Sequence, residues 1–219
     1  MTTEVRVPEP GLRERKKTAT RQALHEAAVR LAMAHGADKI TVEAVADEAG
    51  VSRRTFSNYF ANKEEALLYG DRQRIGALID IVRARPAGEA PWVALTRAAQ
   101  EFYEQLGELD PQWVAQSRLM RAQPALAAQQ VSTFAALERE LAAAVAERND
   151  EPDPQGMRAR LMAAAFMTAM RVSLHVWLEA PDESSLDELV QRSLAETGRG
   201  FGDSGQARGA GRGAFPAPR

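Results

Sequence analysis

Apolar side chains recur along most of the chain at the spacing of an α-helix. In the first clear segment Leu24, Ala28 and Leu31 stand three or four residues apart, and no stretch alternates apolar and polar residues for long enough to predict a strand. The pattern therefore predicts an all-α fold of about nine helices. The expected helices cover residues 12–35 (or 17–35), 42–49, 53–60, 63–84, 91–107, 111–122, 124–148, 155–179 and 184–198.

Proline and glycine mark the ends of these helices. Pro91, Pro111 and Pro124 open three of the segments, where the missing amide hydrogen of proline costs least. Gly36 follows the first helix, at the position where glycine commonly ends one. The expected regions are a flexible arm (1–11), a small N-terminal domain (12–68), a larger helical domain (69–197) and a disordered tail rich in glycine and arginine (198–219).

The composition is typical of a folded soluble protein, with 45% apolar and 26% charged residues. The chain has no cysteine, which excludes disulfides, zinc–thiolate sites and cysteine nucleophiles. The longest apolar run, Leu161–Met170, is shorter than the roughly 20 residues of a membrane span, and residues 1–15 do not resemble a secretory signal. We therefore expect a cytoplasmic protein with no membrane partner, no metal and no cofactor.

The charge of the chain is unevenly distributed. The net charge is −2, yet residues 11–22 carry five basic side chains against the single acidic Glu14. A local basic segment on a mildly acidic body is compatible with one end of the protein binding a polyanion such as DNA.

Residues 41–60 carry the clearest functional pattern. Thr41 and Ser52 are good N-caps for two short helices, and Gly50 between them can adopt the left-handed conformation of a tight turn. Val45 and Ala46 supply an apolar stripe for the first helix, as two phenylalanines do for the second. Two short helices joined by a glycine turn are the plan of a helix-turn-helix, which places its second helix in the major groove of DNA.

Three cations stand where a helix does not favour them. Arg53 and Arg54 occupy the first two positions of one short helix, and Lys63 occupies the first position of the next. Positive charge at a helix N-terminus opposes the helix dipole. The sequence therefore predicts a surface that binds an anion, such as DNA phosphate or the acceptor edge of guanine.

Residues 12–68 resemble the DNA-binding domain of the TetR family of regulators. The resemblance lies in the first helix with Ala27, Ala28 and Leu31, and in Ala49-Gly50-Val51-Ser52, Thr55-Phe56, Tyr59-Phe60 and Asn62-Lys63-Glu64. It implies a dimer that binds a palindromic operator in double-stranded DNA, with Asn58 where the family often has histidine. The residues expected to contact DNA are Lys17, Thr41, Ser52, Arg53, Arg54, Thr55, Asn58, Tyr59 and Lys63.

Residues 90–197 resemble the C-terminal domain of a TetR subgroup that includes mycofactocin regulators. The subgroup is described as binding acyl-CoA-like ligands, which implies a small amphipathic effector whose binding releases the repressor from DNA. Arg118 and Arg121 are candidates for contact with an anionic head. The full set of candidate ligand-binding residues is Phe102, Leu106, Trp113, Arg118, Arg121, Phe134, Met170 and Trp177.

The segment 158–178 is apolar on almost every face between Leu161 and Met170, which is typical of a helix buried on all sides. In a chain of this length one side is expected to meet a second subunit, so we predict a homodimer; an internal core helix in a monomer is the alternative. The candidate dimerisation residues are Leu161, Ala165, Phe166, Leu186, Leu189 and Val190.

An enzyme is the main alternative class, and the sequence disfavours it. The three histidines, His25, His35 and His175, are far apart and lie in no recognised nucleophile or metal motif. A DNA-binding regulator without a small-molecule ligand remains an alternative. The operator sequence, the regulated genes, the effector, the role of the tail, and the choice between repressor and activator stay open.

Overall fold

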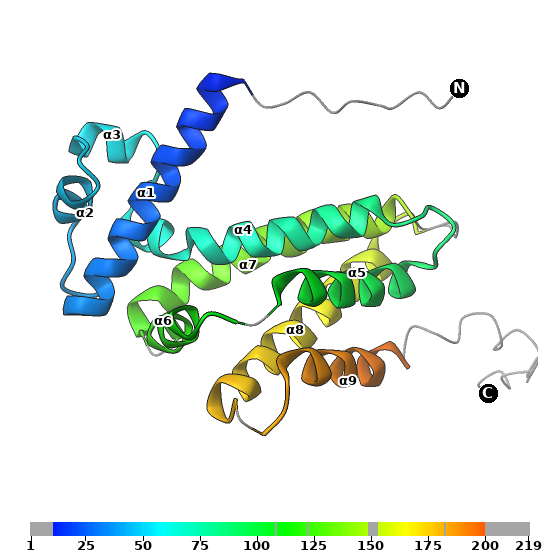
Figure 1. Cartoon of the computed structure of the whole chain (residues 1–219). Helices are drawn as coiled ribbons and strands as arrows, with labels where there is room; N and C mark the ends of the chain where they lie inside the picture. The colour runs from blue at the N-terminus through cyan, green and yellow to red at the C-terminus, as the bar shows by residue number, and fades with distance from the viewer. Residues whose placement is uncertain (1–10, 108, 122, 149–152, 182, 200–219) are drawn as a thin grey trace, which may run out of the picture. The chain divides into compact units, whose positions relative to one another are not determined.

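The computed structural model describes residues 11–107, 109–121, 123–148, 153–181 and 183–199. Within these residues the chain forms nine α-helices and no strand, so the predicted all-α fold is confirmed (Figure 1). The predicted arm, apart from Gly11, and the predicted tail beyond Arg199 lie outside the described residues. The helices are α1 (Leu12–His35), α2 (Val42–Glu48), α3 (Arg53–Ser57), α4 (Lys63–Ala84), α5 (Pro91–Leu106), α6 (Pro111–Arg121), α7 (Pro124–Ala146), α8 (Met157–Glu179) and α9 (Leu186–Gly198).

The observed helix ends lie within a few residues of the predicted ones. The largest difference is at α3, which ends at Ser57 rather than at residue 60. The start of α8 shows the physical cause of a smaller shift: Gly156 has a left-handed φ of 61°, and the Asp153 carboxylate accepts hydrogen bonds from the Met157 and Ala159 amides at 2.9 and 3.2 Å. Asp153 thus caps a helix that begins two residues later than the sequence predicted.

The helices form two compact units. Unit 1 contains the described residues up to Ile75 together with 109–134, and unit 2 contains 76–108 together with 135–199. The division runs through α4 and α7, so each of these helices contributes to both units. These two units do not coincide with the domains predicted from the sequence, in which a boundary at residue 68 separates the DNA-binding part from the effector-binding part.

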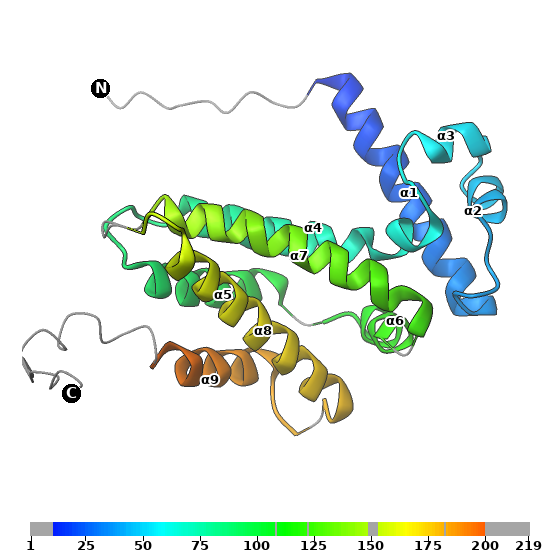
Figure 2. The same cartoon turned by 180° about the vertical axis from the view of Figure 1, so that it is seen from behind.

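Unit 1 has a single apolar core. Leu24 and Ala28 of α1 meet Val45 of α2 and Phe56 of α3, and all four are fully or almost fully buried. Met120 of α6 and Leu126 of α7 join the same cluster. Figures 1 and 2 show α2 and α3 lying along one side of α1. The shared core fixes the two short helices relative to α1.

Helices α1 and α4 approach each other closely in unit 1. His25 of α1 is buried, and its Nδ1 donates a hydrogen bond of 2.8 Å to the Ala66 carbonyl of α4. A Cβ atom on Gly70 would lie only 2.7 Å from His25 Nε2, so a larger residue at this position would force the His25 ring to move. Burial lowers the pKa of His25, which stays neutral as a donor to Ala66.

Unit 2 is built around α8 and α9. Phe166 of α8 and Val190 of α9 are completely buried, and the Ser173 hydroxyl donates a hydrogen bond of 2.8 Å to Ser193 across the two helices. Trp92 of α5 packs edge-on against Phe166, with ring centroids 6.5 Å apart. These contacts make α8 a central helix of the unit.

Helix α8 is also the one described helix that is long and apolar enough to cross a membrane by length and composition. Its buried side chains, among them Met162, Phe166 and Trp177, pack inside unit 2. A core helix of a soluble protein can meet the same criteria of length and composition. Because these side chains are buried, we assign α8 to the core of unit 2.

Candidate nucleic-acid interface

The turn between α2 and α3 has the predicted geometry. Gly50 has a φ of 67°, and the Val51 amide donates a hydrogen bond of 2.9 Å to the Ala46 carbonyl. The Ser52 hydroxyl accepts a hydrogen bond of 3.0 Å from the Thr55 amide, and the Thr41 hydroxyl accepts one of 3.1 Å from the Ala44 amide. Both N-caps are therefore formed, and the turn fixes the direction in which α3 leaves α2.

One side of α3 is anchored in the core and the other faces solvent. Phe56 is buried, and its ring centroid lies 5.8 Å from that of Phe60, which in turn packs against Tyr69 of α4 at 5.5 Å. The exposed positions carry polar or basic side chains that can donate hydrogen bonds to acceptors on DNA. The exposed residues of this side are Ser52, Arg53, Arg54, Ser57 and Asn58, with Thr55 and Tyr59 half-buried.

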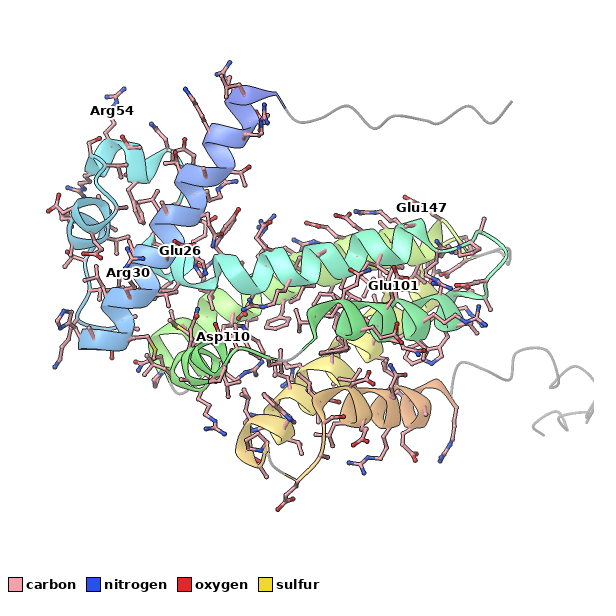
Figure 3. The ribbon with its side chains drawn as sticks, in the orientation of Figure 1. Glu26, Arg30, Arg54, Glu101, Asp110 and Glu147 are labelled. Carbon is pink, nitrogen blue, oxygen red and sulfur yellow. The ribbon has the colours of Figure 1, made fainter. Side chains whose placement is uncertain are left out.

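The two arginines of α3 differ in their surroundings. Arg53 Nε lies 3.1 Å from Glu43 Oε1 of α2, an ion pair between two largely exposed side chains. Arg54 makes no hydrogen bond or ion pair with any of the described residues, and Figure 3 shows it pointing away from α3. An exposed ion pair contributes at most about 1 kcal/mol to stability, so Arg53 can leave Glu43 and bind a phosphate at little cost. Arg54 has no ion pair to break among the described residues.

Lys63 has a different role from the one its position suggested. Its ammonium donates hydrogen bonds to the carbonyls of Ala37, Asp38 and Ile40 at 3.0, 3.1 and 2.9 Å. The three ammonium hydrogens of Lys63 all bind carbonyls of the segment that joins α1 to α2. These hydrogen bonds compensate the unfavourable position of a positive charge at the N-terminus of α4. The dipole argument for a phosphate at Lys63 is corrected, and its contact with DNA stays a prediction that rests on the resemblance alone.

The sequence analysis overlooked Arg21 as a supporting residue. Its guanidinium carbon lies 5.8 to 5.9 Å from the ring centroids of Tyr59, Phe60 and Tyr69, and its Nη2 donates a hydrogen bond of 3.4 Å to the Tyr59 carbonyl. Arg21 thus ties α1 to the chain that leaves α3. The cluster of aromatic residues after α3 was the available signal, because an arginine stacks readily on such rings.

Comparison with known proteins adds two family models and several relatives. Residues 24–69 match the model described as bacterial regulatory proteins, tetR family, and residues 89–202 match the MftR C-terminal domain. The HTH-type transcriptional regulator TcmR of Streptomyces glaucescens is 32% identical over 203 residues, covering 85% of this chain and 90% of TcmR. The chain belongs to the TetR family of transcriptional regulators.

Solved TetR-family structures share the fold at low sequence identity. FadR of Thermus thermophilus, in complex with lauroyl-CoA, is 23% identical with a TM-score of 0.55, covering 91% of this chain and 99% of FadR. SmeT, the repressor of the multidrug efflux pump SmeDEF of Stenotrophomonas maltophilia, is 19% identical with a TM-score of 0.57, covering 84% and 91%. The predicted TetR resemblance, including its mycofactocin-regulator subgroup, is confirmed. The family consists of DNA-binding regulators and not of enzymes.

The candidate ligand-binding residues of this TetR-family chain divide between the two units. Trp113, Arg118, Arg121 and Phe134 belong to unit 1, while Phe102, Leu106, Met170 and Trp177 belong to unit 2. Trp177 is buried, Arg118 is exposed, and the other six are half-buried.

Trp113 has the most distinctive environment among them. The guanidinium carbon of Arg74 lies 4.9 Å from its ring centroid, and its indole Nε1 is buried with no hydrogen-bond acceptor among the described residues. A buried donor without an acceptor is destabilising by about 1–3 kcal/mol.

The candidate dimerisation residues divide by exposure. Phe166 and Val190 have no exposed surface, and Leu186 and Leu189 are also buried within unit 2, so these four support the interior and leave little for a partner to cover. Their burial gives them a structural role within unit 2, and their place in a dimer interface stays a prediction. Leu161 remains more than half exposed, and Ala165 is partly exposed one turn further along α8.

Proposed function

We propose that the protein is a repressor that binds a palindromic operator as a homodimer in the cytoplasm and is released by a small amphipathic effector. The observation that carries the DNA-binding part is α3, a capped helix anchored by Phe56 that presents Arg54 to solvent without an internal partner among the described residues. A bidentate contact from an arginine to guanine contributes about 1–3 kcal/mol of discrimination between bases.

The test is a mobility-shift series on the promoter fragment next to the gene for this protein. Arg54→Ala should weaken binding by about 1–3 kcal/mol, and Arg53→Ala should weaken it less because Glu43 competes for that guanidinium. Arg83→Ala, an exposed arginine on α4 outside the helix-turn-helix, is the matched control. Normal binding by both Arg53→Ala and Arg54→Ala would contradict the assignment of α3 as the reading helix.

The dimer is supported by an exposed apolar stripe along α8. Met157, Leu161, Val172 and Val176 are between 42% and 57% exposed and lie four or eleven residues apart, which places them on one side of the helix. Ala165 continues the stripe. We infer that a second copy covers it, because a stripe of this length in contact with water is unfavourable in a monomer.

Sedimentation of a Leu161→Asp variant tests the dimer. A buried carboxylate in the interface should convert the protein to a monomer and abolish cooperative binding to the operator. Val131→Asp is the control, since Val131 is the most exposed large apolar residue among those described and lies on a different helix, α7. A Leu161→Asp variant that remains a dimer would place the interface elsewhere.

The effector is proposed from the resemblance to the mycofactocin-regulator subgroup and from FadR, which was solved with lauroyl-CoA. The buried Nε1 donor of Trp113, which has no acceptor among the described residues, supports a ligand that offers an acceptor group near an apolar segment. SmeT has been solved with triclosan, so an uncharged aromatic ligand is the competing class.

Titration of the repressor–operator complex separates these ligand classes. Lauroyl-CoA is expected to release the DNA, whereas coenzyme A alone, which lacks the apolar tail, is not. Release by triclosan only would assign the effector to the aromatic class. If neither lauroyl-CoA nor triclosan releases the DNA, that result would count against a small amphipathic effector.

A further inference from the structure

The first two turns of α1 extend beyond the body of unit 1. Every residue from Gly11 to Ala19 is exposed, and the first buried residue of the helix is Leu24. Figures 1 and 2 show that the N-terminal turns of α1 extend beyond α3. Since the described residues leave these side chains exposed, they are available for a partner.

The register of α1 directs a set of cations along one line. Counting back from Leu24 by three or four residues reaches Thr20, Lys17 and Arg13, which share its side of the helix. Lys16 lies beside this line. The side that packs on the helix-turn-helix at Leu24 therefore continues toward the N-terminus as a basic stripe of Arg13, Lys16 and Lys17.

Arg21 fixes this stripe relative to the reading helix. It binds the Tyr59 carbonyl just after α3, as described above. With a rise of about 1.5 Å per residue, Lys17 lies about 6 Å and Arg13 about 12 Å beyond Arg21 along the helix axis. At about 3.4 Å per base pair, this 12 Å corresponds to about three or four base pairs of DNA.

Among the described residues, the charges of the stripe have little compensation. Arg13 and Lys16 make no ion pair with any described residue, and the contact between Lys17 Nζ and Glu14 Oε2 is long, at 4.0 Å, and exposed. Cations held in a row on a stiff helix fit the regularly spaced phosphates of a DNA backbone.

We infer that Arg13, Lys16 and Lys17 bind phosphates of the DNA that flanks the bases read by α3. The inference rests on the proposed operator binding and adds to it a second contact region outside the helix-turn-helix. These contacts increase affinity and salt dependence without changing the preferred sequence, because phosphates carry no direct sequence information.

The experiment uses operator DNA that the full-length protein selects from a random library. Two duplexes are compared, one that ends at the selected bases and one that extends ten base pairs further on each side. For the intact protein, the longer duplex should bind more tightly and with a steeper dependence of log K on log salt. In the Arg13→Ala/Lys16→Ala/Lys17→Ala variant the steepness on the long duplex should fall by about 0.9 for each phosphate that the variant no longer binds.

Arg15→Ala is the matched control for Arg13→Ala. Both arginines are exposed and they lie two residues apart, but Arg15 falls on the opposite side of the helix. Arg13→Ala should reduce the salt dependence on the long duplex, and Arg15→Ala should leave it unchanged.

Equal effects of the two substitutions, or an unchanged slope in the triple variant, would overturn the inference while leaving operator binding intact. A protein that selects no DNA at all would overturn the proposed function and this inference together.

Discussion

The close approach of α1 and α4 makes opposite predictions for two glycines of the same helix. A Cβ atom on Gly76 meets nothing within 4 Å, whereas one on Gly70 would lie 2.7 Å from His25 Nε2 and 3.2 Å from Cε1. Alanine favours a helix interior over glycine by about 1 kcal/mol, so Gly76→Ala should raise the free energy of unfolding by up to that amount.

Gly70→Ala gains the same helix propensity but forces the buried His25 ring to move. Overpacking of this kind costs about 1–3 kcal/mol, and breaking the hydrogen bond from His25 to Ala66 would add about 1 kcal/mol more. We expect a net decrease of about 1–3 kcal/mol in the free energy of unfolding, measured by urea denaturation at constant m-value.

A double-mutant cycle tests the cause of this decrease. In a His25→Ala background the obstructing ring is absent, so Gly70→Ala should become neutral or stabilising, with a coupling energy above about 1 kcal/mol. If Gly70→Ala stabilises the intact protein as much as Gly76→Ala does, then α1 and α4 are not as close as described.

Three further predictions concern buried and bridging groups. Burial lowers the pKa of His25 below its unfolded value of 6.5, so the unfolded chain binds a proton at a higher pH than the folded chain does. The free energy of unfolding should therefore fall as the pH drops from about 7.5 to about 5.5. The His25→Asn substitution should flatten this slope, and His35→Asn, at an exposed position, should not. Lys63→Ala removes the donor to three carbonyls and should lower the free energy of unfolding by about 1 kcal/mol, whereas a loss of DNA affinity at unchanged stability would assign Lys63 to phosphate instead. Gly198→Ala should lower the melting temperature, because its Cβ would overlap the Trp92 indole at Nε1, and an unchanged melting temperature would refute that contact.

The sequence predicted features that depend on neighbouring residues. The caps at Thr41 and Ser52, the turn at Gly50 and the starts of helices at Pro91 and Pro111 all formed as expected. Each of them is set by interactions within about four residues, which a single sequence displays directly.

Interactions between distant residues could not be predicted in this way. Lys63 violates a local rule, but the carbonyls that compensate it lie 23 to 26 residues earlier in the chain. In the same way, the Arg53–Glu43 ion pair links two helices whose relative orientation depends on the turn at Gly50. A local violation therefore indicates that a partner exists without identifying it.

The dimer candidates illustrate a second limit. Helical periodicity identified α8 and α9 as apolar, but it cannot tell whether an apolar side chain meets its own domain or another subunit. Phe166 and Val190 turned inward, while Leu161 and Val172 remained exposed on the opposite side of α8. Exposure in the folded chain is what separates the two groups.

The most direct test of the central claim is the selection of DNA from a random library by the full-length protein and by its Arg54→Ala variant. The intact protein should enrich an inverted repeat whose half-site centres lie about 34–36 Å apart, or a multiple of that distance. The variant should enrich the same repeat with one position in each half relaxed. Failure to enrich any sequence, or an identical and equally strict sequence from both proteins, would contradict the assignment of α3 as the helix that reads DNA.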